Sequence, residues 1–247
     1  MASELFFDRA RMRAGDFTLE ADFSLPAGAP VAVIGPSGSG KTTLLSAVAG
    51  FVPLESGRIL WEGREISGLR PGARPVSTLF QDQNLFPHLT VAQNVGLGLR
   101  PDLRLDRRQQ EAVAQALAQV GLEGLGRRLP GQLSGGQQGR VALARILLRK
   151  RPLLLLDEAF SALGPALKTE MLDLTRRIAA ESGATILMVT HDPADALHMA
   201  PLTVAVEGGR AHPPRDTAQL LADPPPALAA YLGSGRLAHL VKPPPGA

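Results

Sequence analysis

Short apolar runs without polar alternation predict three buried strands in this chain. The runs are Val31–Ile34, Leu153–Leu156 and Thr185–Val189. Runs of this length are typical of parallel strands that are covered on both faces. The segment Arg107–Val120 has helical spacing instead, and residues 57–66 have the pattern of a β-hairpin. Strand-like segments that alternate with helical ones indicate an α/β fold.

The first predicted strand leads into a glycine-rich loop with the spacing of a phosphate-binding loop. Its glycines would let successive backbone N–H groups curve around phosphate oxygens, and the helix predicted over 41–49 would add the partial positive charge of its N-terminus. In this pattern Lys41 reaches the β- and γ-phosphates, and the Thr42 hydroxyl binds Mg²⁺. A plain glycine-rich turn is the alternative. The candidate nucleotide-binding residues are Gly35, Pro36, Ser37, Gly38, Ser39, Gly40, Lys41, Thr42 and Thr43.

A second anion-binding helix start is predicted further along the chain. Ser134 has the position of an N-cap before an amphipathic helix, and the glycines after it would leave backbone N–H groups accessible. The helix dipole would favour an anion at this end. The alternative is an ordinary helix start. The candidate residues are Ser134, Gly135, Gly136 and Gln137.

Chemically active side chains follow the other two predicted strands. Asp157 ends the leucine run, where it would bind Mg²⁺, and Glu158 would polarise the attacking water as a general base. A pair of acids that opens a loop is the alternative. His191 follows the third strand, and ligands of open α/β sheets bind at the carboxyl ends of strands. We expect this histidine to sense the γ-phosphate, although a single histidine is more often an ordinary surface residue.

In this order the motifs resemble those of the ATP-binding subunits of ABC transporters, over residues 5–210. The matching segments are the Walker A loop at 35–42, Gln81 at the Q-loop position, Leu-Ser-Gly-Gly-Gln at 133–137, Walker B at 153–158, residues 161–164 at the D-loop position and His191 at the H-loop position. The resemblance implies a P-loop NTPase of the α/β class. That fold has a mainly parallel core sheet, an N-terminal antiparallel β-subdomain and an α-helical insert, here at about 84–132.

The same resemblance divides the chain into a domain and a tail. Residues 1–210 would form the ATPase domain, and residues 211–247 a short proline-rich tail without a regulatory domain. Proline clusters interrupt this tail. We expect a short helix around 216–232 and a mobile terminus after it.

The resemblance also implies ATP hydrolysis, with ATP and Mg²⁺ as the bound groups. The implied catalytic residues are Lys41, Gln81, Glu158 and His191, and the implied Mg²⁺ ligands are Thr42, Gln81 and Asp157. A nucleotide-dependent homodimer is implied as well, in which Ser134 and Gly136 of one copy close over ATP in the Walker A loop of the other. Two anion-binding helix ends on one chain agree with this, because they are more easily used on one triphosphate across an interface.

In this family a groove beside the Q-loop receives a short cytoplasmic helix of the membrane permease. Leu85, Phe86, His88 and Leu89 are the residues expected there, although Leu85 and Leu89 would fit core packing equally well. Residues 74–99 resemble the corresponding segment of bacterial thiamine importers. The implied cargo is therefore thiamine or thiamine phosphate, delivered by a periplasmic solute-binding protein. Importers of inorganic anions, iron or polyamines are the alternatives.

Several positions depart from the family pattern. Gly164 stands where the D-loop aspartate is usual, Ala159 where a proline follows Walker B, and Gln138–Gly139 where Arg-Gln is commoner. The aromatic residue that would stack on adenine is missing, because Met12–Gly15 occupy its place and the register of Phe17 does not suit it. The missing aromatic predicts weaker ATP binding. Gly164 leaves open a second function, a hydrolysis-poor nucleotide-binding switch.

Composition adds an expectation about location. The net charge of +3 is too small to favour nucleic acid as a partner. The absence of cysteine excludes disulfides and the common zinc sites. The apolar runs are much shorter than a bilayer requires, and the first ten residues do not form a hydrophobic signal segment. We expect a peripheral protein on the cytoplasmic face of the bacterial inner membrane.

Overall fold

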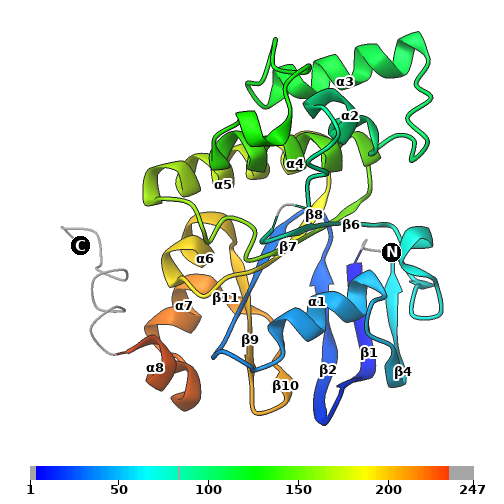
Figure 1. The fold of residues 1–247 in the computed structure, drawn as a ribbon. Helices are drawn as coiled ribbons and strands as arrows, with labels where there is room; N and C mark the ends of the chain where they lie inside the picture. Colours follow the sequence, from blue (N-terminus) through cyan, green and yellow to red (C-terminus); the bar gives the residue numbers. More distant parts are fainter. Residues whose placement is uncertain (1–3, 83, 234–247) are drawn as a thin grey trace. The chain divides into compact units, whose positions relative to one another are not determined.

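The computed structural model describes residues 4–82 and 84–233 of the chain. These residues divide into two compact units. The first unit comprises residues 1–76 and 185–247, and the second comprises residues 77–184. Figure 1 labels most of their helices and strands.

One part of the first unit is an antiparallel set of strands. It consists of β1 (Glu4–Ala14), β2 (Phe17–Pro26), β4 (Leu54–Trp61) and β5 (Arg64–Glu65), in the order β5-β4-β1-β2. Strand β2 buries every second residue from Leu19 to Leu25, as expected for a strand with one covered face. The hairpin predicted over 57–66 is confirmed, because Leu60 of β4 pairs with Glu65 of β5.

The other part of the first unit is mainly parallel. Strand β3 (Pro30–Ile34) lies between β8 (Thr185–Val189) and β9 (Leu202–Glu207) and is parallel to both. Residues 31–34 and all of β8 are buried, which confirms two of the strands predicted from apolar runs. Helix α1 (Lys41–Ala49) packs on β1 and β8, and α6 (Pro193–Met199) packs on β3 (Figure 1).

The C-terminal segment completes the core of the first unit. It contains β10 (Arg210–Ala211), β11 (Arg215–Asp216), α7 (Thr217–Ala222) and α8 (Pro226–Leu232). Leucines of both helices pack with Ile34 and Ala205 in one buried cluster. The single helix predicted around 216–232 is wrong, because Pro224 and Pro225 cannot continue α7. The expected mobile terminus falls at 234–247, outside the described residues.

In its described part, the second unit contains most of strand β6 (Val76–Phe80), strand β7 (Leu153–Asp157) and four α-helices. The two strands are neighbours, and Leu153–Leu156 are buried as predicted. The helices are α2 (Val91–Gly96), α3 (Arg107–Gln119), α4 (Gly135–Arg149) and α5 (Pro165–Ser182). Helix α2 packs on α3 and α4, and α4 packs on α5 (Figure 1). Helix α3 ends within one residue of its predicted end.

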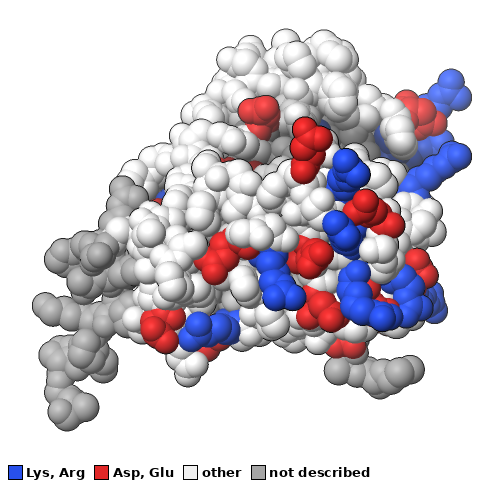
Figure 2. Space-filling model, turned by 90° about the horizontal axis from the view of Figure 1, so that it is seen from below, with Lys and Arg blue, Asp and Glu red and all other residues white. Residues whose placement is uncertain are grey.

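Charge is mixed on the face drawn in Figure 2, where basic and acidic side chains are interspersed. The ion pairs of the first unit include Arg58 with Asp8, and Arg11 with Glu55 at 3.0 Å. The Arg58 guanidinium holds the pKa of Asp8 below its usual value.

Within residues 4–82 and 84–233, no helix has both the length and the apolarity that crossing a bilayer requires.

Candidate functional site

The Walker A loop of the first unit connects β3 to α1, as predicted. Lys41 is buried, and its ammonium group donates hydrogen bonds to the carbonyl oxygens of Gly35 and Pro36, both at 2.8 Å. The Ser39 amide donates to the carbonyl of Pro36 at 3.2 Å, which curves the loop back on itself. Thr42 follows with an exposed position at the start of α1. The ammonium group and the helix N-terminus therefore lie together at this loop, where they would attract a phosphate.

One polar group of the loop suits a phosphate ligand, and one glycine of the loop is required by packing. The Ser39 hydroxyl oxygen is buried, and it has no hydrogen-bond partner among the described residues. A buried hydroxyl is costly unless it is paired, and a phosphate oxygen would pair it. A Cβ atom on Gly35 would lie 2.1 Å from the carbonyl oxygen of Val206. Glycine is thus required there by the close approach of β9.

Phe17 lies against the same loop. A Cβ atom on Gly40 would be 2.7 Å from the ring of Phe17. On the neighbouring strand, Ala14 is the cross-strand partner of Phe17. The ring therefore packs on the last glycine of the phosphate loop.

His191 lies at the strand edge that also carries the Walker A loop. Val33 and Val189 are paired in parallel strands, and the Thr190 amide donates to the carbonyl of Val33 at 3.1 Å. The Thr190 hydroxyl donates to Asp195 at 3.0 Å and accepts from the amide of Asp192 at 3.0 Å. These bonds fix the turn on both sides of His191. Within the first unit, the fold thus brings the predicted histidine and the predicted phosphate loop to adjacent strand ends.

In the second unit, the signature segment 133–137 forms the predicted helix start. Ser134 caps α4: its hydroxyl accepts from the Gln137 amide at 3.3 Å, and the Gln137 side chain accepts from the Ser134 amide at 3.0 Å. This reciprocal pair is a capping box. Ser134 and Gly135 are exposed, so the first turn of α4 is accessible to an anion.

Gly136 and Gln138 anchor this turn to the rest of the second unit. Gly136 is buried, and a Cβ atom there would lie 2.4 Å from Cδ2 of Leu167 on α5. The Gln138 amide group donates to the carbonyls of Pro130 and Leu133, at 3.1 and 3.3 Å. The departure from the family pattern at Gln138 therefore supplies a local brace, and α4 forms despite the glycine after it.

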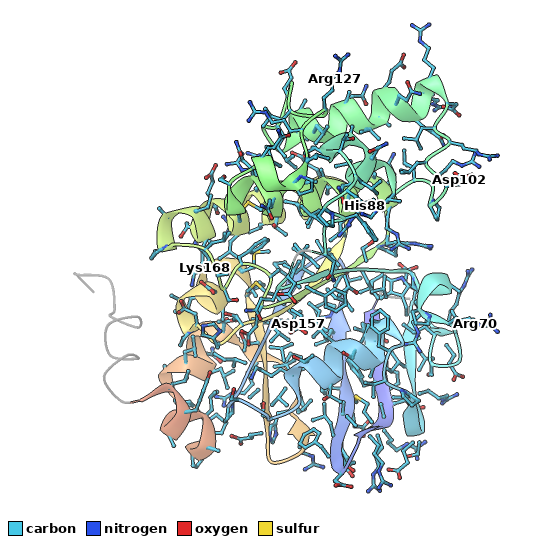
Figure 3. The ribbon with its side chains drawn as sticks, in the orientation of Figure 1. Arg70, His88, Asp102, Arg127, Asp157 and Lys168 are labelled. Atoms are coloured by element: carbon cyan, nitrogen blue, oxygen red, sulfur yellow. The ribbon has the colours of Figure 1, made fainter. Side chains whose placement is uncertain are left out.

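The Walker B segment, residues 153–158, forms strand β7 and the residue that follows it, as predicted. Asp157 is half-buried at the end of the strand (labelled in Figure 3). Glu158 has a φ of 47°, an uncommon left-handed conformation for a residue other than glycine. The change of backbone direction places Glu158 outside the strand alternation. The turn that follows is closed by the Ser161 amide, which donates to the carbonyl of Glu158 at 3.1 Å.

Gln81 directly follows β6 and is exposed. Beyond it, a groove of about 280 Å³ lies in the second unit. Of the four residues predicted for a docking groove, Phe86 lines it, whereas Leu85, His88 and Leu89 are not among its lining residues. Burial lowers the pKa of the Arg145 guanidinium in this groove, and the nearby charge of Arg149 lowers it further. The lining residues are Ser77, Thr78, Phe80, Asn84, Phe86, Leu97, Gly98, Arg145, Ile146 and Arg149.

Asn94 supports the loop beside this groove, a role that the sequence did not predict. It is fully buried, its carbonyl oxygen accepts from the Phe86 amide at 2.8 Å, and its amide group donates to the carbonyls of Phe86, Leu89 and Thr90. It therefore shapes the loop beside the groove. The available signal was the capping box of Thr90 and Gln93, which fixes the start of α2 just ahead of it.

Comparison with known proteins agrees with these motifs. The sequence pattern of the family described as "ABC transporter" matches residues 19–161. "Thiamine import ATP-binding protein ThiQ" of Cereibacter sphaeroides is 63% identical over 229 residues, covering 93% of this chain and 99% of the relative. The protein of that name from a Ruegeria species is 55% identical over 223 residues, which cover 90% of this chain and 96% of the relative.

A solved structure gives the same result for the fold. It is cbiO1 from Clostridium perfringens, described as part of the ABC transporter complex cbiONQ. The TM-score is 0.81 at 26% identity, and the match covers 97% of this chain and 99% of cbiO1. The expected P-loop fold of the α/β class is thereby confirmed. This chain belongs to the ABC transporter family, as one of its ATP-binding ATPases.

Proposed function

We propose that this chain is the ATP-hydrolysing subunit of an importer for thiamine or a thiamine phosphate. The observation that carries the proposal is the 63% identity, over 93% of this chain, to a protein named as a thiamine import ATP-binding protein. The buried Lys41 and the orphaned Ser39 hydroxyl support a triphosphate as the ligand of the loop.

In the proposed reaction, the backbone amides of the loop 35–40 and the Lys41 ammonium group bind the phosphates. Thr42, Gln81 and Asp157 would hold Mg²⁺, since hydroxyl, amide and carboxylate oxygens are ligands that suit this ion. Mg²⁺ would neutralise negative charge on the phosphate oxygens. Glu158 would accept a proton from the attacking water as a general base, and His191 would orient the γ-phosphate.

We also propose a nucleotide-dependent homodimer with head-to-tail symmetry. Ser134 and Gly136 of one copy would close over ATP in the Walker A loop of the other. The support is that the first turn of α4 has an exposed, capped N-terminus, and such a helix end favours an anion. The groove beside Gln81 would receive a helix of the membrane permease. A periplasmic solute-binding protein would deliver the transported substrate to this permease. The chain would then act at the cytoplasmic face of the bacterial inner membrane.

The proposal is tested by measuring the uptake of labelled thiamine. The cells lack this chain and are complemented with its wild-type or variant form. The wild-type chain should restore uptake, and Glu158→Gln should not. In the purified complex, Glu158→Gln should lower ATP turnover by about 10²–10⁴-fold while leaving ATP binding intact. Glu181→Gln, at an exposed position of α5, is the matched control and should keep full activity. Restored uptake of an inorganic anion, iron or a polyamine, with none of thiamine, would contradict the cargo.

Gly164 supports a second candidate, a nucleotide-binding switch with poor hydrolysis. Steady-state release of phosphate from the chain with its permease separates the two. Turnover that the transported substrate stimulates favours the importer ATPase, and nucleotide binding without turnover favours the switch.

A further inference from the structure

Arg74 is a buried arginine of the first unit, and its side chain makes several hydrogen bonds. It is only 3% exposed, and its guanidinium group donates hydrogen bonds to four backbone carbonyl oxygens. The partners are Ala47 at 2.5 Å, Val48 at 2.9 Å, Ser67 at 2.6 Å and Leu69 at 3.0 Å. None of these partners is a carboxylate. Burial lowers the pKa of Arg74, but a guanidinium group stays charged in proteins.

Two of the four bonds hold the carboxyl end of α1. The carbonyls of Ala47 and Val48 belong to its last turn, where carbonyls lack the regular hydrogen bond from four residues further on, although the Gly50 amide also donates to Ala47 at 3.2 Å. A cation at this end also interacts favourably with the helix dipole. The helix stops at Gly50, which has a φ of 89°, and a Cβ atom there would lie 2.6 Å from Nε of Arg74. Gly50 therefore both ends the helix and leaves room for the guanidinium group.

The other two bonds hold the chain that leads to the Q-loop position. Ser67 and Leu69 precede the short turn 71–73, and Arg74 is followed by Pro75 and by β6, whose end is next to Gln81. The opposite end of α1 is Lys41 and the phosphate loop. The helix is about 12 Å long at 1.5 Å per residue. The phosphate loop lies at its N-terminal end and Arg74 at its C-terminal end.

We infer that Arg74 is a positioning residue for the nucleotide: it clamps the rear of α1 to the segment that continues into β6, and thereby holds the Walker A loop in its binding geometry. The inference rests on ATP being the ligand of that loop. A planar guanidinium group with five fixed donors can serve four carbonyls at once, whereas a lysine ammonium group is a flexible point charge. Lysine at this position keeps the charge and loses the clamp.

The test uses Arg74→Lys and Arg74→Gln in the full chain, with Arg70→Lys and Arg70→Gln as matched controls. Arg70 is exposed in the same unit, and Figure 3 shows its side chain extending outward. Binding of a non-hydrolysable ATP analogue is measured by calorimetry, with the folded fraction determined by circular dichroism. ATP turnover with the permease gives KM and kcat.

Arg74→Lys should raise the dissociation constant and KM about 10-fold, equivalent to about 1.4 kcal/mol, while kcat at saturating ATP changes less than about twofold. Arg74→Gln should lose more affinity, and both Arg70 variants should bind as the wild type does. A folded Arg74→Lys chain that binds the analogue normally, with only a lower melting temperature, would overturn the inference. So would failure of both Arg74 variants to fold, because the residue would then serve folding alone. A wild-type chain that fails to bind the analogue would instead contradict the proposed function.

Discussion

Gly135 and Gly136 are adjacent in the first turn of α4, and they form a matched pair for measuring how closely this turn packs on α5. A Cβ atom on Gly136 would lie 2.4 Å from Cδ2 and 3.0 Å from Cδ1 of Leu167. A Cβ atom on Gly135 has nothing within 4 Å in the part of the chain that the structure describes. Alanine at either position gains the same helix propensity, so the contact with Leu167 is the main difference between the two variants.

The expected magnitudes follow from these two terms. Alanine is favoured over glycine by about 0.8–1.0 kcal/mol in a helix interior. Gly135 is the first residue of α4, so Gly135→Ala should raise the free energy of unfolding by at most about 1 kcal/mol. At position 136 the same gain is opposed by overpacking, which costs about 1–3 kcal/mol. Gly136→Ala should therefore lie about 1–3 kcal/mol below Gly135→Ala.

Urea unfolding of the purified chain, followed by circular dichroism, measures this difference. The single tryptophan, Trp61, is in the first unit, so its fluorescence reports that unit separately. In a Leu167→Ala background the penalty at position 136 should disappear, which a double-mutant cycle would record as a coupling energy. Equal stability of Gly135→Ala and Gly136→Ala would refute the packing argument, as would a penalty that persists without the Leu167 side chain.

Other substitutions test the remaining features. Gly164→Asp should cap α5, because the N-cap position of this helix has an extended backbone and, among the described residues, no side-chain cap. The free energy of unfolding in urea should rise by about 0.3–1 kcal/mol. A fall in this free energy would contradict the prediction. Ala14→Tyr places an aromatic ring opposite Phe17, beside the phosphate loop. Because base stacking contributes about 1–3 kcal/mol, the Kd for ATP measured by calorimetry should fall several-fold. An unchanged Kd would contradict the prediction. Arg58→Gln should release the depressed pKa of Asp8. The wild-type chain should then be more stable above the unfolded pKa of about 3.9, and its advantage should shrink as the pH falls through the lower folded pKa; a pH-independent difference in melting temperature would exclude this cause.

The strands and the ends of helices could be predicted from the sequence where one local cause decides them. Val31–Ile34 and Leu153–Leu156 are apolar without interruption, and burial on both faces follows from that alone. Ser134 begins α4, and Gly50 ends α1, for reasons contained in one or two residues. Because the phosphate-binding motifs are of this local kind, their positions on the elements were predictable as well.

The features that were not predicted depend on contacts between residues far apart in the chain. Arg74 gave no signal in the sequence, since its partners are carbonyl groups whose positions depend on the fold. The same holds for Asn94, which organises the loop at Phe86 through backbone groups. The tail is a different case. Its proline pair was visible, but the burial of Leu228 in the same cluster as Ile34 was not.

The structure also separates the glycines that the fold requires from one that it does not. A Cβ atom would collide with backbone at Gly35 and with a side chain at Gly136, whereas at Gly164 it would meet no atom of the described residues within 4 Å. Packing therefore does not explain why glycine stands at the D-loop position. Because Gly164→Asp should fold at least as well as the wild type, any change in its ATP turnover can be assigned to the chemistry of the aspartate. Faster turnover in that variant would indicate that Gly164 limits hydrolysis in this chain, and equal turnover would mean that the remaining site residues suffice.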